Sequence, residues 1–336
     1  MRVTGGSELA RMKMLQRLAI ETRNKLDTAG TEMTSGLKAS RYEATGGNLT
    51  RLFALERSLD RNAVFTATIS LTETRVDTMQ TALGTILAPL EDLAVDLSTA
   101  VSLGDKASAL THAATARADF KGTVSALNAQ VAGQSLFAGT ATDRAALAPA
   151  DAILAELDAL AQGAATGADA VAAIDAYFAR PTGGFYATGY TGSGDDLAEV
   201  DIGDGNRLDA GLRADRDELV AVLRGQALAA VVAGGAFAGD TDAQMTMLGA
   251  AADSLLPAKE GLLALRSALG TVQETVENAK AQRVAERETI DLGRTALLAT
   301  DPLEAASTFD ALENQLSAIY TVTARLSSLR FLNFMS

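Results

Sequence analysis

The residues best suited to chemistry lie in the middle of the chain, where carboxylates crowd into a short stretch. Carboxylate oxygens are the ligands that Ca²⁺ prefers, so this stretch is a candidate calcium site. Its spacing does not match an EF-hand loop, which places its ligands at fixed positions around an invariant glycine and ends on a bidentate glutamate. We therefore interpret the stretch as a solvated acidic face and predict no metal site. The carboxylates are those of Asp195, Asp196, Glu199, Asp201 and Asp204.

Two further motifs resemble parts of nucleotide-binding or catalytic sites. Gly189, Gly192 and Gly194 make a glycine-rich turn, but they lack the GxGxxG spacing and no phosphate-binding lysine follows them. The segment GQSLF at 133–137 begins like a nucleophile elbow, yet it lacks the final glycine of that motif. The chain has one histidine, His112, and no cysteine, so thiolate chemistry is excluded and most histidine-dependent catalysis lacks its base. The sequence predicts no catalytic residues, no cofactor and a protein that is not an enzyme.

The composition indicates helices that pack along their length. Of the 336 residues 48% are hydrophobic, but only 4% are aromatic and tryptophan is absent. Much of the apolar fraction is alanine, which favours helices and buries little area per residue. The net charge of −13 would repel phosphate, so we predict no nucleic-acid partner. The sequence has neither a long apolar run nor an apolar leader segment, which predicts no membrane insertion and no cleaved signal peptide.

The first helix that the sequence predicts carries a heptad seam. Apolar residues recur at alternating spacings of three and four, which is the a/d pattern of a helix that packs on another helix. Ser7 is its candidate N-cap, and Gly36 follows its expected end. The seam comprises Met12, Leu15, Ala19, Thr22, Leu26, Ala29 and Met33.

Longer helices with the same period follow. Residues 52–100 are predicted to form one helix, with Asn48 as its candidate cap and Pro89 as the site of a kink. A break at 102–106 then precedes a helix predicted over 107–132.

Two more helices with this spacing make up the C-terminal part. The first runs from 241 to about 292, and the second begins with Asp301 as its cap and Pro302 as its first residue. Because an amphipathic helix without a partner leaves its apolar face in water, we expect the first and the last helix of the chain to pair. The seam of the last helix comprises Ala305, Phe309, Leu312, Leu316, Ile319, Thr323 and Leu326.

The middle of the chain has a different pattern. Residues 150–180 predict one or two alanine-rich helices, and 215–233 predicts a further short helix. Between them, 183–212 is a region of β pattern, and the turn residues of VDIGDGNRL predict a hairpin at 200–208. We expect this acidic part to fold as a small unit of its own on the outside of the molecule.

Four segments resemble the bacterial flagellin superfamily. EMTSGLKASRYEATGG at 32–47 is similar to the turn that follows the first helix of that family, and GQSLFAGTATD at 133–143 is similar to its LFxG segment. The segment 300–335 and the opening MRVT resemble the branch of hook–filament junction proteins, hook-associated protein 3. Where the family has a pair of aspartates after the first turn, this chain has Glu43 alone.

The resemblance implies a fold that is mainly α: a long antiparallel helical rod with terminal coiled-coil helices and a small α+β insertion domain. The expected organisation is an N-terminal coiled-coil segment at 1–40, the first half of the rod at 41–143, an outward-facing acidic α+β insertion at 144–240, the second half of the rod at 241–298 and a C-terminal coiled-coil helix at 299–336.

The resemblance also implies a structural role without catalysis at the hook–filament junction. The partners would be the hook-side junction protein and flagellin, together with an export chaperone, and the location would be the extracellular flagellum, reached without a cleaved signal peptide. Two alternatives are a flagellin paralogue that builds the filament itself and a cytoplasmic helical binding or signalling module. The expected assembly interface comprises Met12, Leu15, Ala19, Leu26, Met33, Phe309, Leu312, Leu316, Ile319, Leu326, Leu329, Phe331 and Phe334.

Overall fold

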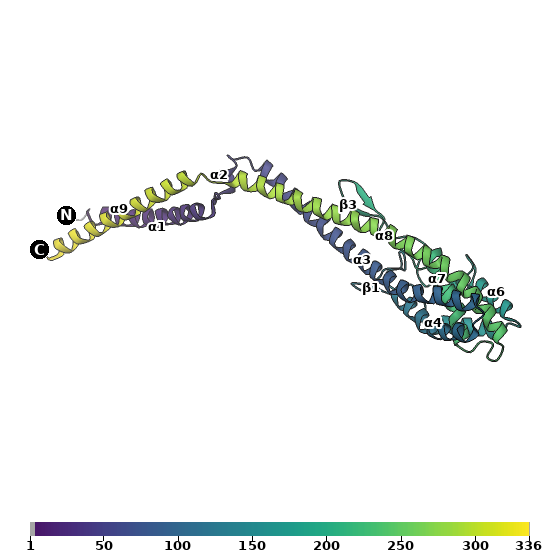
Figure 1. The fold of residues 1–336 in the computed structure, drawn as a ribbon. Coiled ribbons are helices and arrows are strands. Elements are labelled where there is room, and N and C mark those ends of the chain that lie inside the picture. Colours follow the sequence, from purple (N-terminus) through teal and green to yellow (C-terminus); the bar gives the residue numbers. More distant parts are fainter. Residues whose placement is uncertain (1–3, 336) are drawn as a thin grey trace. The chain divides into compact units, whose positions relative to one another are not determined.

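The computed structural model describes the backbone of residues 4–335 and the side chains of residues 10–326. This part of the chain is mainly helical, and its paired strands form two small two-stranded sheets (Figure 1). The chain divides into two compact units. Unit 1 comprises the residues up to Ala63 and those from Val284 onward, and unit 2 comprises Val64–Arg283. None of the described helices is long and apolar enough to cross a membrane. The five-segment organisation stays a prediction.

Unit 1 contains the two terminal helices. α1 (Thr4–Ser35) and α9 (Pro302–Met335) pack along one another, which confirms the predicted pairing. α1 begins before the predicted cap at Ser7, and it ends where predicted because Gly36 has a φ of 70°, a conformation that favours glycine. The one-turn helix α2 (Arg41–Ala44) follows.

Two long helices contribute to both units. α3 (Thr50–Ser102) begins where the Asn48 side chain accepts a hydrogen bond from a backbone N–H at 3.0 Å, as predicted. α8 (Thr241–Leu298) runs antiparallel to α3 within unit 2. The predicted cap of α9, Asp301, likewise accepts a backbone N–H at 2.8 Å. Local residue chemistry therefore predicted these helix starts correctly.

The helix after the predicted break is shorter than expected. α4 (Lys106–Leu127) ends before residue 132, so that part of the prediction is wrong. The Asn128 side chain accepts the N–H of Leu147 at 2.8 Å and donates to its carbonyl at 3.0 Å, which holds the chain in a non-helical path. A small hairpin of β1 (Gln130–Val131) and β2 (Gln134–Ser135) follows.

The paired strands of the middle region are those of the predicted hairpin, and Leu147 and Tyr190 add one isolated antiparallel bridge. The two turn residues of the hairpin, Asp204 and Gly205, have φ values of 57° and 78°, as a tight hairpin turn requires. The prediction of a β region over the whole of 183–212 is wrong, because Phe185 begins a π-helix. The ring of Phe185 packs with its centre 5.4 Å from that of Phe178. The elements between β2 and α8 are α5 (Ala150–Gln162), α6 (Gly167–Phe178), η1 (Phe185–Gly189), β3 (Val200–Gly203), β4 (Asn206–Leu208) and α7 (Asp217–Ala233).

The segment after β2 runs through the main hydrophobic core of unit 2. Leu136, Phe137 and Ala138 are fully buried. At Gly139, which has a φ of 61°, a Cβ atom would lie 2.4 Å from the carbonyl oxygen of Asp195, so only glycine fits. The LFxG pattern therefore has a packing role, because it lets the chain pass directly beneath the insertion.

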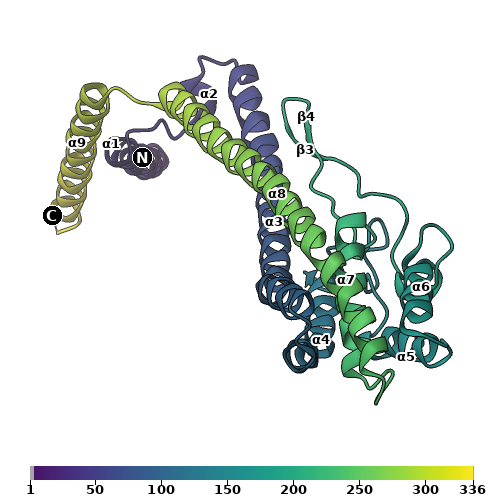
Figure 2. The same ribbon diagram turned by 45° about the vertical axis from the view of Figure 1, so that its right-hand side comes forward.

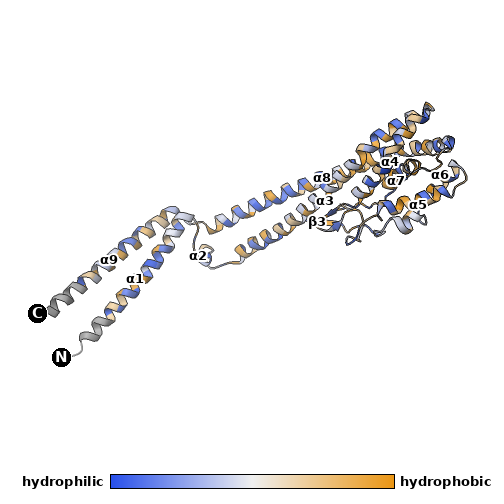
Figure 3. Cartoon of the chain, turned by 90° about the horizontal axis from the view of Figure 1, so that it is seen from below, coloured by the Kyte–Doolittle hydropathy of each residue, from blue (hydrophilic) through white to orange (hydrophobic). Residues whose placement is uncertain are grey.

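α7 connects the insertion to the long helices. It packs against α4, and Gly225 lies so near α8 that a Cβ there would be 2.6 Å from a methyl group of Leu255. Most side chains of α7 are buried, as in a helix that is apolar on nearly every side and must be surrounded. Hydrophobic residues gather among α4, α5 and α7 (Figure 3). The insertion therefore shares one hydrophobic core with the long helices, and its role as a separate outward-facing unit stays a prediction.

Candidate assembly interface

Three of the five acidic residues that could have formed a metal site are engaged in other contacts. The Asp204 carboxylate lies 2.5 Å from Arg283, and the Asp196 carboxylate lies 3.4 Å from Arg213. Asp201 accepts a backbone N–H two residues further on and so shapes the hairpin turn. Among the described residues, no group of three or more Asp, Glu, His or Cys side chains is arranged to hold a metal ion.

The other chemical motifs have structural roles. Ser135 of the GQSLF segment is fully buried in β2. Gly192 makes room for the ring of Tyr190, because a Cβ there would lie 2.5 Å from the tyrosine hydroxyl. His112 lies with its Nδ1 3.7 Å from the carboxylate of Asp96 on the surface. The structure does not bring these residues together.

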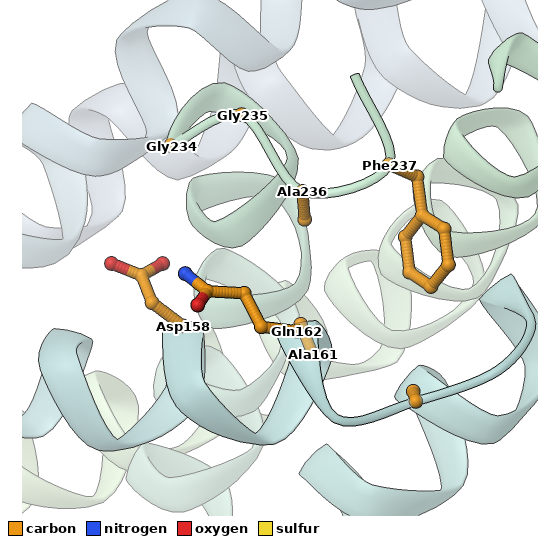
Figure 4. A pocket seen from close by; sticks show the side chains of 8 residues that line it. Asp158, Ala161, Gln162, Gly234, Gly235, Ala236 and Phe237 are labelled. Atoms are coloured by element: carbon orange, nitrogen blue, oxygen red, sulfur yellow. The ribbon is translucent and has the colours of Figure 1, made fainter. Parts of the chain in front are cut away.

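A cavity of about 170 Å³ opens between α5 and the turn that follows α7. Figure 4 shows Asp158 and Gln162 of α5 on one side of it and the backbone of Gly234 and Gly235 on the other. The Asp158 carboxylate already accepts two hydrogen bonds from Arg117, at 2.8 and 3.2 Å. Ligand sites usually measure roughly 300–1,000 Å³. A small cavity whose acid is already paired does not favour a substrate site.

The paired helices α1 and α9 bring the predicted seams of both termini together. Thr22, Ala29 and Ile319 are buried. Gly30 lies directly against Phe309, since a Cβ at this glycine would be 3.3 Å from the ring. The heptad spacing thus predicted correctly the faces that the two helices turn toward each other. The half-buried members of the predicted seams are Met12, Leu15, Ala19, Leu26, Phe309, Leu312, Leu316, Thr323 and Leu326.

A short backbone pairing fixes the point where α1 and α9 come together. The Lys38 N–H donates to the Leu298 carbonyl at 2.8 Å, and the Thr300 N–H donates to the Gly36 carbonyl at 2.9 Å. The segment after α1 and the segment before α9 therefore form a small antiparallel bridge. The turn that resembles flagellins is the part of the chain that makes this bridge.

Some of the predicted interface residues are not part of the described seam. Met33 is 47% exposed, because the last turn of α1 lies where α9 has only begun. Leu329, Phe331 and Phe334 lie outside the residues whose side chains the structure describes. The role of all these residues in assembly stays a prediction.

Apolar side chains also lie outside the seam, and the sequence interpretation missed them. Met14 is 70% exposed and Ile20 is 62% exposed, and they occupy heptad positions c and b of α1. In a self-contained helix pair these outer positions are polar. The spacing from the seam could have revealed them. Leu18, Tyr320 and Val322 are further exposed apolar residues of the pair, so α1 and α9 present apolar surface that one chain does not cover.

Between residues 21 and 28 the exposed surface of α1 is polar. Lys25 donates a hydrogen bond to Glu21 at 2.7 Å, and this bond together with the lysine charge lowers the pKa of the Glu21 carboxyl. Asn24 and Thr28 are exposed as well. Apolar and polar outer positions therefore occur on the same helix.

Limited trypsin digestion of the dilute protein is expected to cut α1 before it cuts unit 2. Helices that are half exposed open locally at low free energy, whereas the helices of unit 2 share a core. We expect cleavage after Arg11, Lys13 and Arg17 while the bonds after Arg117 and Arg224 stay intact, as followed by mass spectrometry of the fragments. Resistance of α1 equal to that of unit 2 would contradict this expectation.

Comparison with known proteins gives one family and similar solved structures. Residues 7–142 match the bacterial flagellin N-terminal helical region. The structure of Bacillus cereus FlgL aligns with a TM-score of 0.50 at 14% identity and covers 72% of this chain and 100% of that chain. A structure assigned as a flagellar hook-associated protein from Vibrio parahaemolyticus aligns with a TM-score of 0.48 at 16% identity, covering 72% of this chain and 94% of that chain. No curated protein matches the chain. At 14% identity, the alignment with the Bacillus cereus structure shows that the two chains share a fold and shows no more than that.

Proposed function

We propose that this chain, whose residues 7–142 carry the bacterial flagellin N-terminal helical region, is a structural component of the flagellum at the junction of hook and filament. It assembles through its terminal helices and performs no catalysis. Its partners are a hook-side junction protein on one side and flagellin on the other. An export chaperone binds it in the cell, and it acts in the extracellular flagellum.

The observation that carries this proposal is the apolar surface of the α1–α9 pair. Met14 and Ile20 lie outside the seam and are largely exposed in the single chain. Burying such a side chain stabilises a complex by roughly 1.5–3 kcal/mol. Packing of the pair against neighbouring subunits buries this apolar surface, which the isolated chain leaves exposed to water.

The junction role is favoured over a filament role by the resemblance of residues 300–335 to the junction branch and by the fold shared with Bacillus cereus FlgL. A junction subunit meets different partners at its two ends, whereas a filament subunit must bind itself in a contact that does not close. The second candidate, a flagellin paralogue, is favoured by the match of residues 7–142 to a flagellin region.

Deletion of this chain from its bacterium is expected to abolish swimming while the hook remains. Electron microscopy should show hooks without filaments, and immunoblots should show flagellin released into the medium, because subunits are exported but have no junction on which to assemble. Bare hooks with no flagellin in the medium would indicate that the chain is itself the subunit that builds the filament. Normal hooks with normal filaments would contradict a flagellar role.

A further inference from the structure

The α1–α9 pair has two ends of different composition. The helices leave the backbone bridge side by side and in opposite chain directions, and Gly30 lies against Phe309 near that bridge. The connections that form the bridge, from α1 to α2 and from α8 to α9, are visible in Figure 2. The early residues of α1 therefore lie beside the late residues of α9. The outer half of the pair comprises residues 10–23 and 316–326, and the inner half, next to the bridge, comprises residues 26–35 and 301–313.

The outer half is basic and the inner half is acidic. The outer half carries five basic side chains and one acidic side chain, that of Glu21, whereas the inner half carries six acidic side chains and no basic one. All of them are exposed except Glu32, which is half-buried. The two halves of the pair therefore present surfaces of opposite charge to solvent. The basic residues are Arg11, Lys13, Arg17, Arg23 and Arg325, and the acidic residues of the inner half are Asp27, Glu32, Asp301, Glu304, Asp310 and Glu313.

The two halves of one chain do not neutralise each other. Their centres lie roughly 20 Å apart along the helices, at about 1.5 Å per residue. Exposed charges at that distance are largely screened from one another, because the Debye length is about 10 Å at 0.1 M salt. Two such pairs that lie side by side in the same direction without an offset would place basic beside basic and acidic beside acidic. An offset of roughly 20 Å instead places the outer half of one pair beside the inner half of the next.

Exposed apolar residues accompany the charges on both halves. Met14, Ile20 and Tyr320 belong to the outer half and are mostly exposed. In the inner half Leu303 is 79% exposed and Met33 is 47% exposed. The offset that opposes the unlike charges also brings these two apolar groups to the same level along the axis, so their burial adds to the contact.

We infer that a second copy of this chain binds with the basic outer half of its α1–α9 pair beside the acidic inner half of the first, in the same direction and offset by roughly 20 Å. This inference rests on the proposed assembly through the terminal helices and specifies the contact between neighbouring copies. The apolar side chains supply most of the binding, because exposed ion pairs each contribute little, and the charges set the offset.

The offset contact leaves one half of each pair free for a further copy. An antiparallel dimer would also oppose unlike halves, but it uses both halves at once and closes on itself, whereas an offset contact in one direction continues. The contact is a lateral one between neighbouring subunits. It is separate from the two ends at which a junction subunit meets other proteins.

Charge reversal in the full-length protein tests this contact by sedimentation velocity at low ionic strength, where exposed charges are least screened. An acidic variant makes both halves acidic, and a basic variant makes both halves basic. Each variant alone should associate about tenfold more weakly than the parent protein, because its copies meet like charges at every offset. An equimolar mixture of the two should associate like the parent and form species larger than dimers. The acidic variant is R11E/K13E/R17E, and the basic variant is D27K/E304K/D310K/E313K.

Two controls separate the contact from a general effect of charge or folding. R51E/R57E/R61E makes the same change in net charge as the acidic variant, at three exposed arginines of α3, and should associate like the parent. Circular dichroism of each variant should match the parent, because glutamate and lysine are both good helix formers and the substituted side chains are exposed.

A mixture that associates as weakly as each variant alone overturns the inference, and so does a parent protein that stays monomeric at every concentration. Association of the mixture that stops at dimers overturns it too, because the copies would then pack antiparallel. The deletion phenotype is a separate result. Hooks without filaments together with a failed mixture would leave the proposed function standing without this contact, whereas normal filaments together with a restored mixture would keep the contact and remove the flagellar role.

Discussion

Replacing residues 148–238 with a short Gly/Ser linker is expected to abolish the cooperative thermal transition of unit 2. The replacement removes α7, the helix on which α4 packs, and uncovers the surface of α8 around Leu255. It also removes the cover over Phe137, which lies fully buried beneath the insertion and accepts a backbone N–H from Ala214 at 2.9 Å. Each large apolar side chain that returns to water forfeits roughly 1.5–3 kcal/mol. A handful of such losses matches the roughly 5–15 kcal/mol by which a folded domain is usually stable.

Circular dichroism measures this outcome directly. We expect the mean residue ellipticity of the remaining chain to fall well below that of the parent protein and its melting to become broad. The matched control inserts the same linker after Gly163, in the exposed turn between α5 and α6, and should melt like the parent. Parent-like helicity and melting of the replaced chain would show that the insertion folds independently of the long helices.

The double substitution M14E/I20E is expected to abolish assembly while leaving the single chain folded. Both side chains are mostly exposed in the isolated chain, and glutamate is a good helix former, so α1 should keep its helicity. In an assembled structure the same positions would bury two charges without partners, which costs several kcal/mol. A loss of that size weakens association by about two orders of magnitude or more.

Complementation of the deletion strain provides the readout. M14E/I20E should restore neither swimming nor filaments, although the protein is exported and shows parent-like circular dichroism after purification. The matched control N24E/T28E makes the same change in charge at exposed polar positions of the same helix and should restore swimming. Full swimming with M14E/I20E would show that Met14 and Ile20 are not part of the assembly interface.

The elements that depend on neighbouring residues could be predicted from the sequence. Helix starts followed from cap chemistry, as at Asn48 and Asp301, because a side-chain oxygen satisfies backbone N–H groups within the next turn. The seam faces of α1 and α9 followed from the alternating three and four spacing, because that period lines up one face of a helix. The hairpin at 200–208 followed from the Asp204–Gly205 turn. All of these interactions span only a few residues.

The remaining features were decided by the tertiary structure. The insertion shares the core of the long helices because α7 is apolar on nearly every side, and the sequence does not say which helices surround it. Asp204 and Arg283 meet across 79 positions of the chain, so no local pattern could pair them. The heptad positions of Met14 and Ile20 place them outside the seam, but that the single chain leaves them largely exposed is shown only by the packed α1–α9 pair. Burial depends on which surfaces meet after the chain has folded, and the period of a helix specifies its faces but not the partner of each face.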